Sequence, residues 1–151
     1  MMLFYGVFAA VGNVIGGKMT DFLGTERSVM TILLLLSADL LLMYFFGNSM
    51  IIMGILVATI GAISYAAVPA MQARVINIAK NYVPEAIPVA SGLNIAGFNS
   101  GIALGSVVGG VIISHASIIY LALGGVIISL AGVCVMFLTP RPTKAFVGQD
   151  K

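Results

Sequence analysis

The sequence predicts an all-α membrane protein with five transmembrane helices. Of its 151 residues, 60% are hydrophobic and 8% are charged, and the mean hydropathy of +1.14 lies outside the range of soluble globular domains. The apolar residues form five runs separated by short polar segments. Each run is long enough to cross the roughly 30 Å hydrocarbon core of a bilayer as a helix.

The first run covers about residues 1–18 and ends at Lys18, whose long side chain can reach the membrane surface. It has neither a basic start nor a small-residue cleavage site, so it does not read as a signal peptide. The segment from Gly17 to Arg27 then carries four of the chain's seven basic and five acidic residues. We interpret it as a charged cytoplasmic loop between two spans.

The other spans follow from turn signals between the apolar runs. Gly47-Asn48-Ser49 is a turn-forming trio, and Pro84 with Glu85 suits the first turn of a helix, where proline is tolerated and an acid complements the helix dipole. The resulting partial transmembrane bundle, residues 1–139, has further spans at about 28–46, 50–73, 86–114 and 118–138, with a cytoplasmic tail at 140–151.

The basic residues predict the orientation of the chain. On this arrangement every lysine and arginine falls on one side of the membrane, and by the positive-inside rule that side is cytoplasmic. The N-terminus is then outside and the C-terminus is inside, in a cell (inner) membrane. The residues concerned are Lys18, Arg27, Arg74, Lys80, Arg141, Lys144 and Lys151.

Small residues recur at helical spacing within the predicted spans. Such residues let helix backbones approach closely in a bilayer, so we expect helix-packing surfaces there. The fourth span carries a glycine series, Gly97, Gly101, Gly105 and Gly109, with Gly110 beside the last. The third span has its own series, Gly54, Ala58, Ala62, Ala66 and Ala70, and shorter ones are Gly12 with Gly16 in the first span and Gly125 with Ser129 in the fifth.

Two motifs carry a family resemblance. The spacing of Gly17, Asp21, Gly24 and Arg27 resembles the signature loop of the major facilitator superfamily, although Phe22 stands where that loop usually has a basic residue. The segment Gly105 to Gly110 is similar to the Gly-Pro-x-x-Gly-Gly motif of antiporters in that superfamily, with Ser106 in place of proline. The region from Pro84 to Gly110 resembles the eleventh span of bacterial drug:proton, arabinose-efflux-like and purine-efflux-like permeases.

The resemblance implies that the five helices are spans eight to twelve, most of the C-terminal six-helix bundle of a major-facilitator fold. It implies proton-coupled efflux of a small organic solute, a drug, sugar or purine, by alternating access. The first half and seventh span have no counterpart here, so we expect a fragment that needs the missing half of a transporter or another copy. The alternative is an autonomous five-span homo-oligomeric channel or structural subunit.

Asp39 is the acidic residue that lies well inside an apolar run. Burying a charge at such a depth costs roughly 2.5–3.5 kcal/mol on insertion scales, so a proton-coupling role is the default hypothesis. The ninth span of the resembling fold is peripheral, which favours the alternative that Asp39 pairs with a polar neighbour or is tolerated as a protonated acid.

Polar and aromatic residues within the spans are candidates for a substrate cavity. Asn94 and Asn99 are about 140° apart around their helix, so both cannot face one narrow cavity. Asn94 could instead bond to a neighbouring helix, and the aromatic residues could be core. The candidates are Asn94, Phe98, Asn99, Tyr65, Tyr5 and Asn13.

The sequence offers no basis for catalysis or cofactor binding. Its single cysteine, Cys134, excludes an intramolecular disulfide, and no metal-ligand spacing, catalytic triad or phosphate loop occurs. The net charge of +2 from dispersed basic residues does not indicate nucleic acid binding. The expected partners are the lipid bilayer, a small-molecule substrate and protons.

Overall fold

The computed structural model describes the backbone of residues 2–115 and 119–139 and the side chains of residues 6–115 and 120–139. The expected tail, 140–151, and most of the expected turn after the fourth span lie outside these residues. The described chain is helical, without strands. Its elements are α1 (Met2–Leu23), α2 (Thr25–Phe46), α3 (Met50–Tyr82), the 3-10 turn η1 (Pro84–Ala86), α4 (Ile87–His115) and α5 (Ile119–Leu138).

The helices confirm an all-α membrane protein. Four segments are long and apolar enough to cross a bilayer: Thr25–Phe46, Met50–Tyr82, Pro84–His115 and Tyr120–Leu138. The 22 residues of α1 complete the five expected helices. At 33 residues α3 would extend roughly 50 Å, so it outruns both the expected span, 50–73, and the hydrocarbon thickness.

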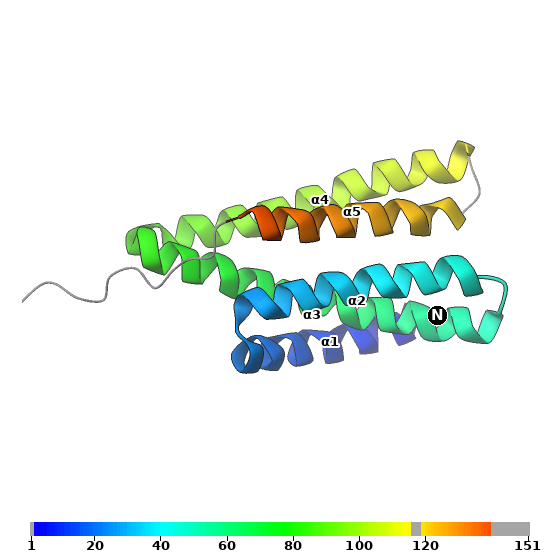
Figure 1. Cartoon of the computed structure of the whole chain (residues 1–151), viewed down its shortest axis with the longest axis horizontal. Helices are drawn as coiled ribbons and strands as arrows, with labels where there is room; N and C mark the ends of the chain where they lie inside the picture. Colours follow the sequence, from blue (N-terminus) through cyan, green and yellow to red (C-terminus); the bar gives the residue numbers. More distant parts are fainter. Residues whose placement is uncertain (1, 116–118, 140–151) are drawn as a thin grey trace, which may run out of the picture.

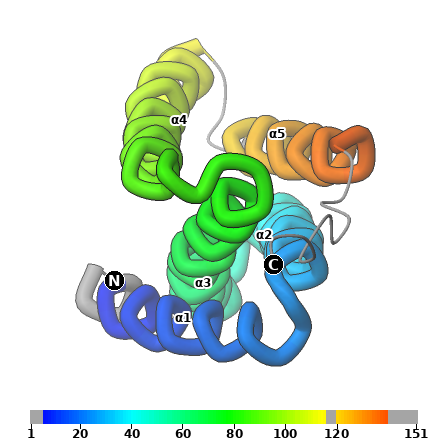
Figure 2. Tube along the Cα trace, turned by 90° about the vertical axis from the view of Figure 1, so that its left-hand side faces the viewer, coloured from blue at the N-terminus to red at the C-terminus, as the bar shows by residue number. Residues whose placement is uncertain are grey.

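The five helices run roughly along the long axis of the molecule (Figure 1). Helix α1 packs along α3, and α2 packs against both α3 and α5. Seen along that axis, α4 stands apart from α1 and α2 and meets α3 at one end (Figure 2). Only Gly109 of α4 is buried. The chain therefore forms a packed group of four helices with α4 on its edge.

Small residues explain the close packing of α1 on α3. A Cβ atom added to Gly12 or Gly16 would overlap the backbone of Ala62 or Ala66 on α3. This contact confirms the expectation that the small-residue series of the first and third spans are packing surfaces. Since no side chain fits between the two backbones, the sequence at these glycines fixes the distance between the helices.

A second packing surface joins α2 to α5. A Cβ on Gly125 would lie 2.9 Å from Leu40 Cδ1, and Ser129 Oγ donates a hydrogen bond of 2.9 Å to the Leu33 carbonyl oxygen. The small pair expected in the fifth span is therefore confirmed as a contact with α2.

The glycine series of α4 differs from the other two series. A Cβ on Gly97, Gly101, Gly105 or Gly110 would meet nothing within 4 Å, and one on Gly109 would lie 3.3 Å from Leu121 Cδ1. Within the described residues, no helix backbone uses this surface. Its role in helix packing stays a prediction that concerns a partner outside these residues.

The charged segment between the first two spans is nearly all helix, which corrects our interpretation of it as a loop. Helix α1 continues to Leu23 and α2 starts at Thr25, so only Gly24 separates them. Its φ of 81° lies in the left-handed region that glycine adopts without strain. Ser28, fully buried, donates a 2.9 Å hydrogen bond to the Met19 carbonyl oxygen and holds the two helices together.

Candidate functional site

Asp39 is buried between α2 and α3, with 6% of its surface exposed. Thr59 Oγ1, on α3, lies 2.7 Å from Asp39 Oδ1 and donates a hydrogen bond to it. Asp39 Oδ2 is buried and has no hydrogen-bond partner among the described residues. The structure therefore places an acidic side chain inside the membrane with one oxygen bonded and one oxygen available.

The helical hairpin explains why these two residues meet. Helices α2 and α3 run antiparallel through the turn at 47–49. Residues at similar distances before and after such a turn lie at the same level, and Asp39 and Thr59 are nine and eleven positions from Asn48. This bond is the polar pairing that we expected as the favoured alternative for Asp39, although the sequence alone did not identify Thr59 as the partner. The similar distances of the two residues from the turn Gly47-Asn48-Ser49 could have identified it.

Thr59 also lines an apolar cavity along α3. This cavity has a volume of about 400 Å³ and is bordered by Phe8 of α1 and by one face of α3. Thr59 is the polar side chain among its lining residues; the others on α3 are Ile51, Gly54, Ile55, Val57 and Ala58. The Thr59 hydroxyl group thus connects an apolar cavity to the Asp39 carboxyl group.

The basic residues of the described chain gather at one end of the bundle, which we call the basic end: Lys18, Arg27, Arg74 and Lys80. There Arg74 Nε donates to Glu26 Oε1 at 2.8 Å, the ion pair of the described chain. It ties the start of α2 to α3. The positive-inside rule had placed Arg74 on the cytoplasmic side, but its partner Glu26 is 48 positions away and was not identified from the sequence.

A polar chain joins α3 to α4 close to the basic end. Gln72 Nε2 donates to Ser91 Oγ, and Asn94 Nδ2 donates to Gln72 Oε1 at 2.7 Å. For Asn94 we considered cavity lining and a bond to a neighbouring helix, and the structure shows the bond to a neighbouring helix. Asn99 bonds instead to the Ile95 carbonyl oxygen of its own helix, at 3.0 Å.

The other predicted cavity residues with described side chains lie on three different helices. Phe98 on α4, Tyr65 on α3 and Asn13 on α1 are all exposed, and none of them lines the apolar cavity. The side chain of Tyr5 lies outside the described residues. Their part in a substrate cavity stays a prediction.

The signature residues lie at the basic end without binding one another. Asp21 and Arg27 are exposed, and their side chains have no hydrogen-bond or ion-pair partner in the part of the chain that the structure describes. Gly17 faces open space, and Gly24 supplies the break between α1 and α2. Contacts of Asp21 beyond this chain stay a prediction.

Comparisons with known proteins agree on one family. The model of the Major Facilitator Superfamily matches residues 1–151. The chain is 35% identical over 130 residues to the "Uncharacterized MFS-type transporter YtbD" of Bacillus subtilis (strain 168). The matched region covers 85% of this chain and 32% of that protein. The chain is 32% identical over 142 residues to the "Inner membrane transport protein YdhP" of Escherichia coli O157:H7, 93% of this chain and 35% of that protein.

The chain thus spans about a third of the length of these curated relatives. No solved structure matches it. The family model covers the whole chain, and the helical bundle has the composition of an integral membrane protein. The chain is a member of the major facilitator superfamily.

Proposed function

We propose that the chain forms part of a proton-coupled efflux permease of the cell membrane, which moves a small organic solute by alternating access. One observation carries this proposal: a buried acid on α2, Asp39, is bonded to Thr59, which also lines an apolar cavity. An ionisable residue inside a membrane marks a functional site by default. Here it lies next to a cavity that a solute could occupy.

Asp39 is the proposed proton carrier. Thr59 has one hydroxyl hydrogen, and Asp39 Oδ1 at 2.7 Å is the nearest of its three acceptors; the carbonyl oxygens of Leu56 and Ile55 lie at 3.0 and 3.2 Å. Oδ2 can therefore take a proton while the bond to Oδ1 persists. A solute that displaces the Thr59 hydroxyl group would remove a hydrogen bond from the ionised acid and favour its protonation. Solute and proton would then be coupled through one side chain.

The cavity favours a hydrophobic, drug-like solute over a sugar. Its volume of about 400 Å³ is within the range of small-molecule sites, and among the described residues its lining is apolar apart from Thr59. A sugar would leave several hydroxyl groups without hydrogen-bond partners there, at a cost of roughly 1–3 kcal/mol for each buried group. A planar or aliphatic solute with few polar groups avoids that cost.

The basic end of the bundle indicates the orientation of the chain and a surface for a partner. The described basic residues lie at one end of the bundle, and we assign that end to the cytoplasm by the positive-inside rule. Asp21, exposed there, would bind the N-terminal half of a transporter or another copy and act as a gate. The open glycine face of α4 would contact the same partner.

A chimera tests this function. The chimera is YdhP in which this chain replaces the matching third of the sequence. Inside-out vesicles that contain the chimera are energised to hold a proton gradient. A hydrophobic dye cation, a pentose and a purine base are then added in turn. We expect the dye to dissipate the gradient. A gradient that no solute dissipates, in a chimera that is inserted and folded, contradicts the proposal.

The cavity variant Ala58→Phe fills the proposed solute site, and Ala10→Phe is its control, on an exposed position of α1 that does not line the cavity. We expect loss of dye-driven proton flux in Ala58→Phe and not in Ala10→Phe.

The isolated chain, tested beside the chimera, distinguishes the proposed function from the alternative of an autonomous five-span channel. Robust proton-driven efflux from the isolated chain would favour a homo-oligomer.

A further inference from the structure

A second cavity, of about 450 Å³, lies at the basic end between the α1–α2 junction and the last turns of α3. Two cationic side chains, Arg27 and Lys80, and two amide side chains, Asn77 and Asn81, line it. All four are exposed, and none has a side-chain hydrogen bond or ion pair within the described residues. Four uncommitted donor groups therefore share one open cavity.

The charge of this cavity is positive. Glu26 also lines it, but its carboxylate is bound to Arg74 at 2.8 Å. The Arg74 Nη2 atom is buried and has no hydrogen-bond partner among the described residues. Because Arg74 compensates the charge of Glu26, Arg27 and Lys80 have no ion-pair partner within the part of the chain that the structure describes. The cavity is thus suited to an anion.

The start of α2 adds donors to the same cavity. Gly24 and Thr25 line it, and no side chain caps the first turn of the helix. The first backbone N–H groups of a helix have no acceptor in their own helix and attract anions, especially phosphate. Here they act together with two cationic side chains and do not stand alone.

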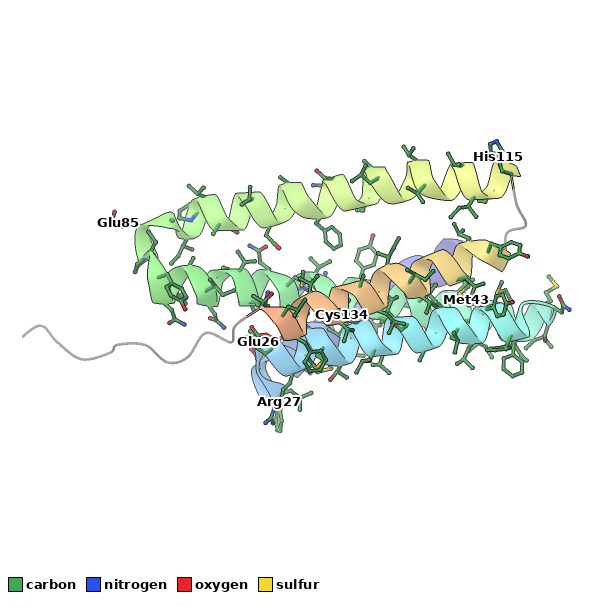
Figure 3. All side chains as sticks on the ribbon, turned by 45° about the horizontal axis from the view of Figure 1, so that its top comes forward. Glu26, Arg27, Met43, Glu85, His115 and Cys134 are labelled. Carbon is green, nitrogen blue, oxygen red and sulfur yellow. The ribbon has the colours of Figure 1, made fainter. Side chains whose placement is uncertain are left out.

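The cavity also lies where apolar and polar surfaces meet. Leu23 is one of its lining residues and is 45% exposed, and the neighbouring Phe22 is 95% exposed. Exposed leucine and phenylalanine side chains at the membrane boundary can lie against the acyl chains of the bilayer. Arg27 extends outward from the bundle at the start of α2 (Figure 3). A ligand with both a phosphate group and acyl chains fits this boundary.

We propose that this cavity binds the headgroup of an anionic glycerophospholipid. Arg27 and Lys80 bind the phosphate group, Asn77 and Asn81 hydrogen-bond the glycerol oxygens, and the acyl chains lie against the apolar surface next to Leu23. A lipid with a choline headgroup brings a third cation to the cavity and binds more weakly. This binding does not depend on the transport activity proposed above.

Native mass spectrometry of the unmodified chain in mild detergent tests the preference. Phosphatidylglycerol and phosphatidylcholine with the same acyl chains are titrated separately. We expect one retained phosphatidylglycerol with an apparent Kd about tenfold lower than that of phosphatidylcholine. Equal retention of the two lipids overturns the proposal, and this comparison needs no variant that could misfold.

A variant set then tests the residues. We expect the double variant Arg27→Gln with Lys80→Gln to weaken phosphatidylglycerol binding roughly 20-fold, because each basic residue contributes about a fivefold preference. Lys18→Gln is the matched control: it removes a charge at the same end but does not line the cavity. An equal loss in the control overturns the site. Displacement of the lipid by millimolar inorganic phosphate would show a site for soluble anions and also overturn the proposal.

Discussion

Thr59 Oγ1 lies 2.7 Å from Asp39 Oδ1, and this hydrogen bond joins α2 to α3 inside the apolar part of the bundle. Hydrogen bonds between membrane helices contribute about 0.6 kcal/mol on average, with a maximum near 1.7. We expect Thr59→Val to lower the free energy of unfolding by about 1 kcal/mol and Thr59→Ser to leave it nearly unchanged. Unfolding in mixed micelles with increasing dodecyl sulfate measures this. Equal stability of Thr59→Val and the parent chain would show that the bond is not made.

The contact of Gly16 with Ala66 leaves no room for a methyl group. We expect Gly16→Ala to destabilise the bundle by about 1–3 kcal/mol, as overpacking does in dense interiors. The control is the neighbouring Gly17→Ala, whose Cβ meets nothing within 4 Å. It should be neutral or slightly stabilising, since alanine restricts the unfolded chain and favours the helix. The same unfolding assay applies, and equal effects of the two changes would contradict the close approach of α1 to α3.

The break between α1 and α2 depends on the φ of 81° at Gly24. Alanine in that region costs roughly 1–2 kcal/mol, whereas asparagine tolerates it better. We therefore expect the order of stability to be glycine, then asparagine, then alanine at position 24. A Cβ there has open space around it, so steric overlap does not account for the effect. If alanine is as stable as glycine, the two helices are joined in another way.

Glu26 and Arg74 bind across 48 positions of sequence, with 27% and 14% of their side chains exposed. A double-mutant cycle with Glu26→Gln and Arg74→Gln should give a coupling free energy of about 1 kcal/mol, above that of a fully exposed pair. It should decrease only slightly at 0.5 M salt, because partly buried pairs are weakly screened. A coupling of zero would mean that the pair does not connect α2 to α3 in the membrane.

The five helices follow from the sequence because their signal is local. Hydrophobic runs of membrane length need no tertiary information, and the turn at 47–49 is a local glycine, asparagine and serine signal. The small-residue series of α1 and α3 also predicted a packing surface that the structure confirms.

Contacts between distant residues were harder to predict. In the sequence, Glu26 belongs to a charged segment and has no evident partner. The fold brings Arg74 of α3 to the same end of the bundle, where the two side chains form an ion pair. The continuation of α1 to Leu23 does not follow from the charge pattern, because charged residues mark the end of a membrane span while the helix itself can continue into water. For α4, the sequence predicts a packing face, and no helix backbone among the described residues lies against it.

The most direct test of the proposed coupling is the proton flux of Asp39→Asn in the YdhP chimera. Asparagine keeps the size of the side chain and an oxygen that accepts from Thr59, but it cannot carry a proton. Ser37→Ala is the control: Ser37 is buried two positions away on α2 and bonds only to its own helix, at the Leu33 carbonyl oxygen. We predict that solute-driven proton flux is lost in Asp39→Asn and retained in Ser37→Ala. Proton flux in Asp39→Asn equal to that of the parent chimera would contradict a proton-carrying role for Asp39.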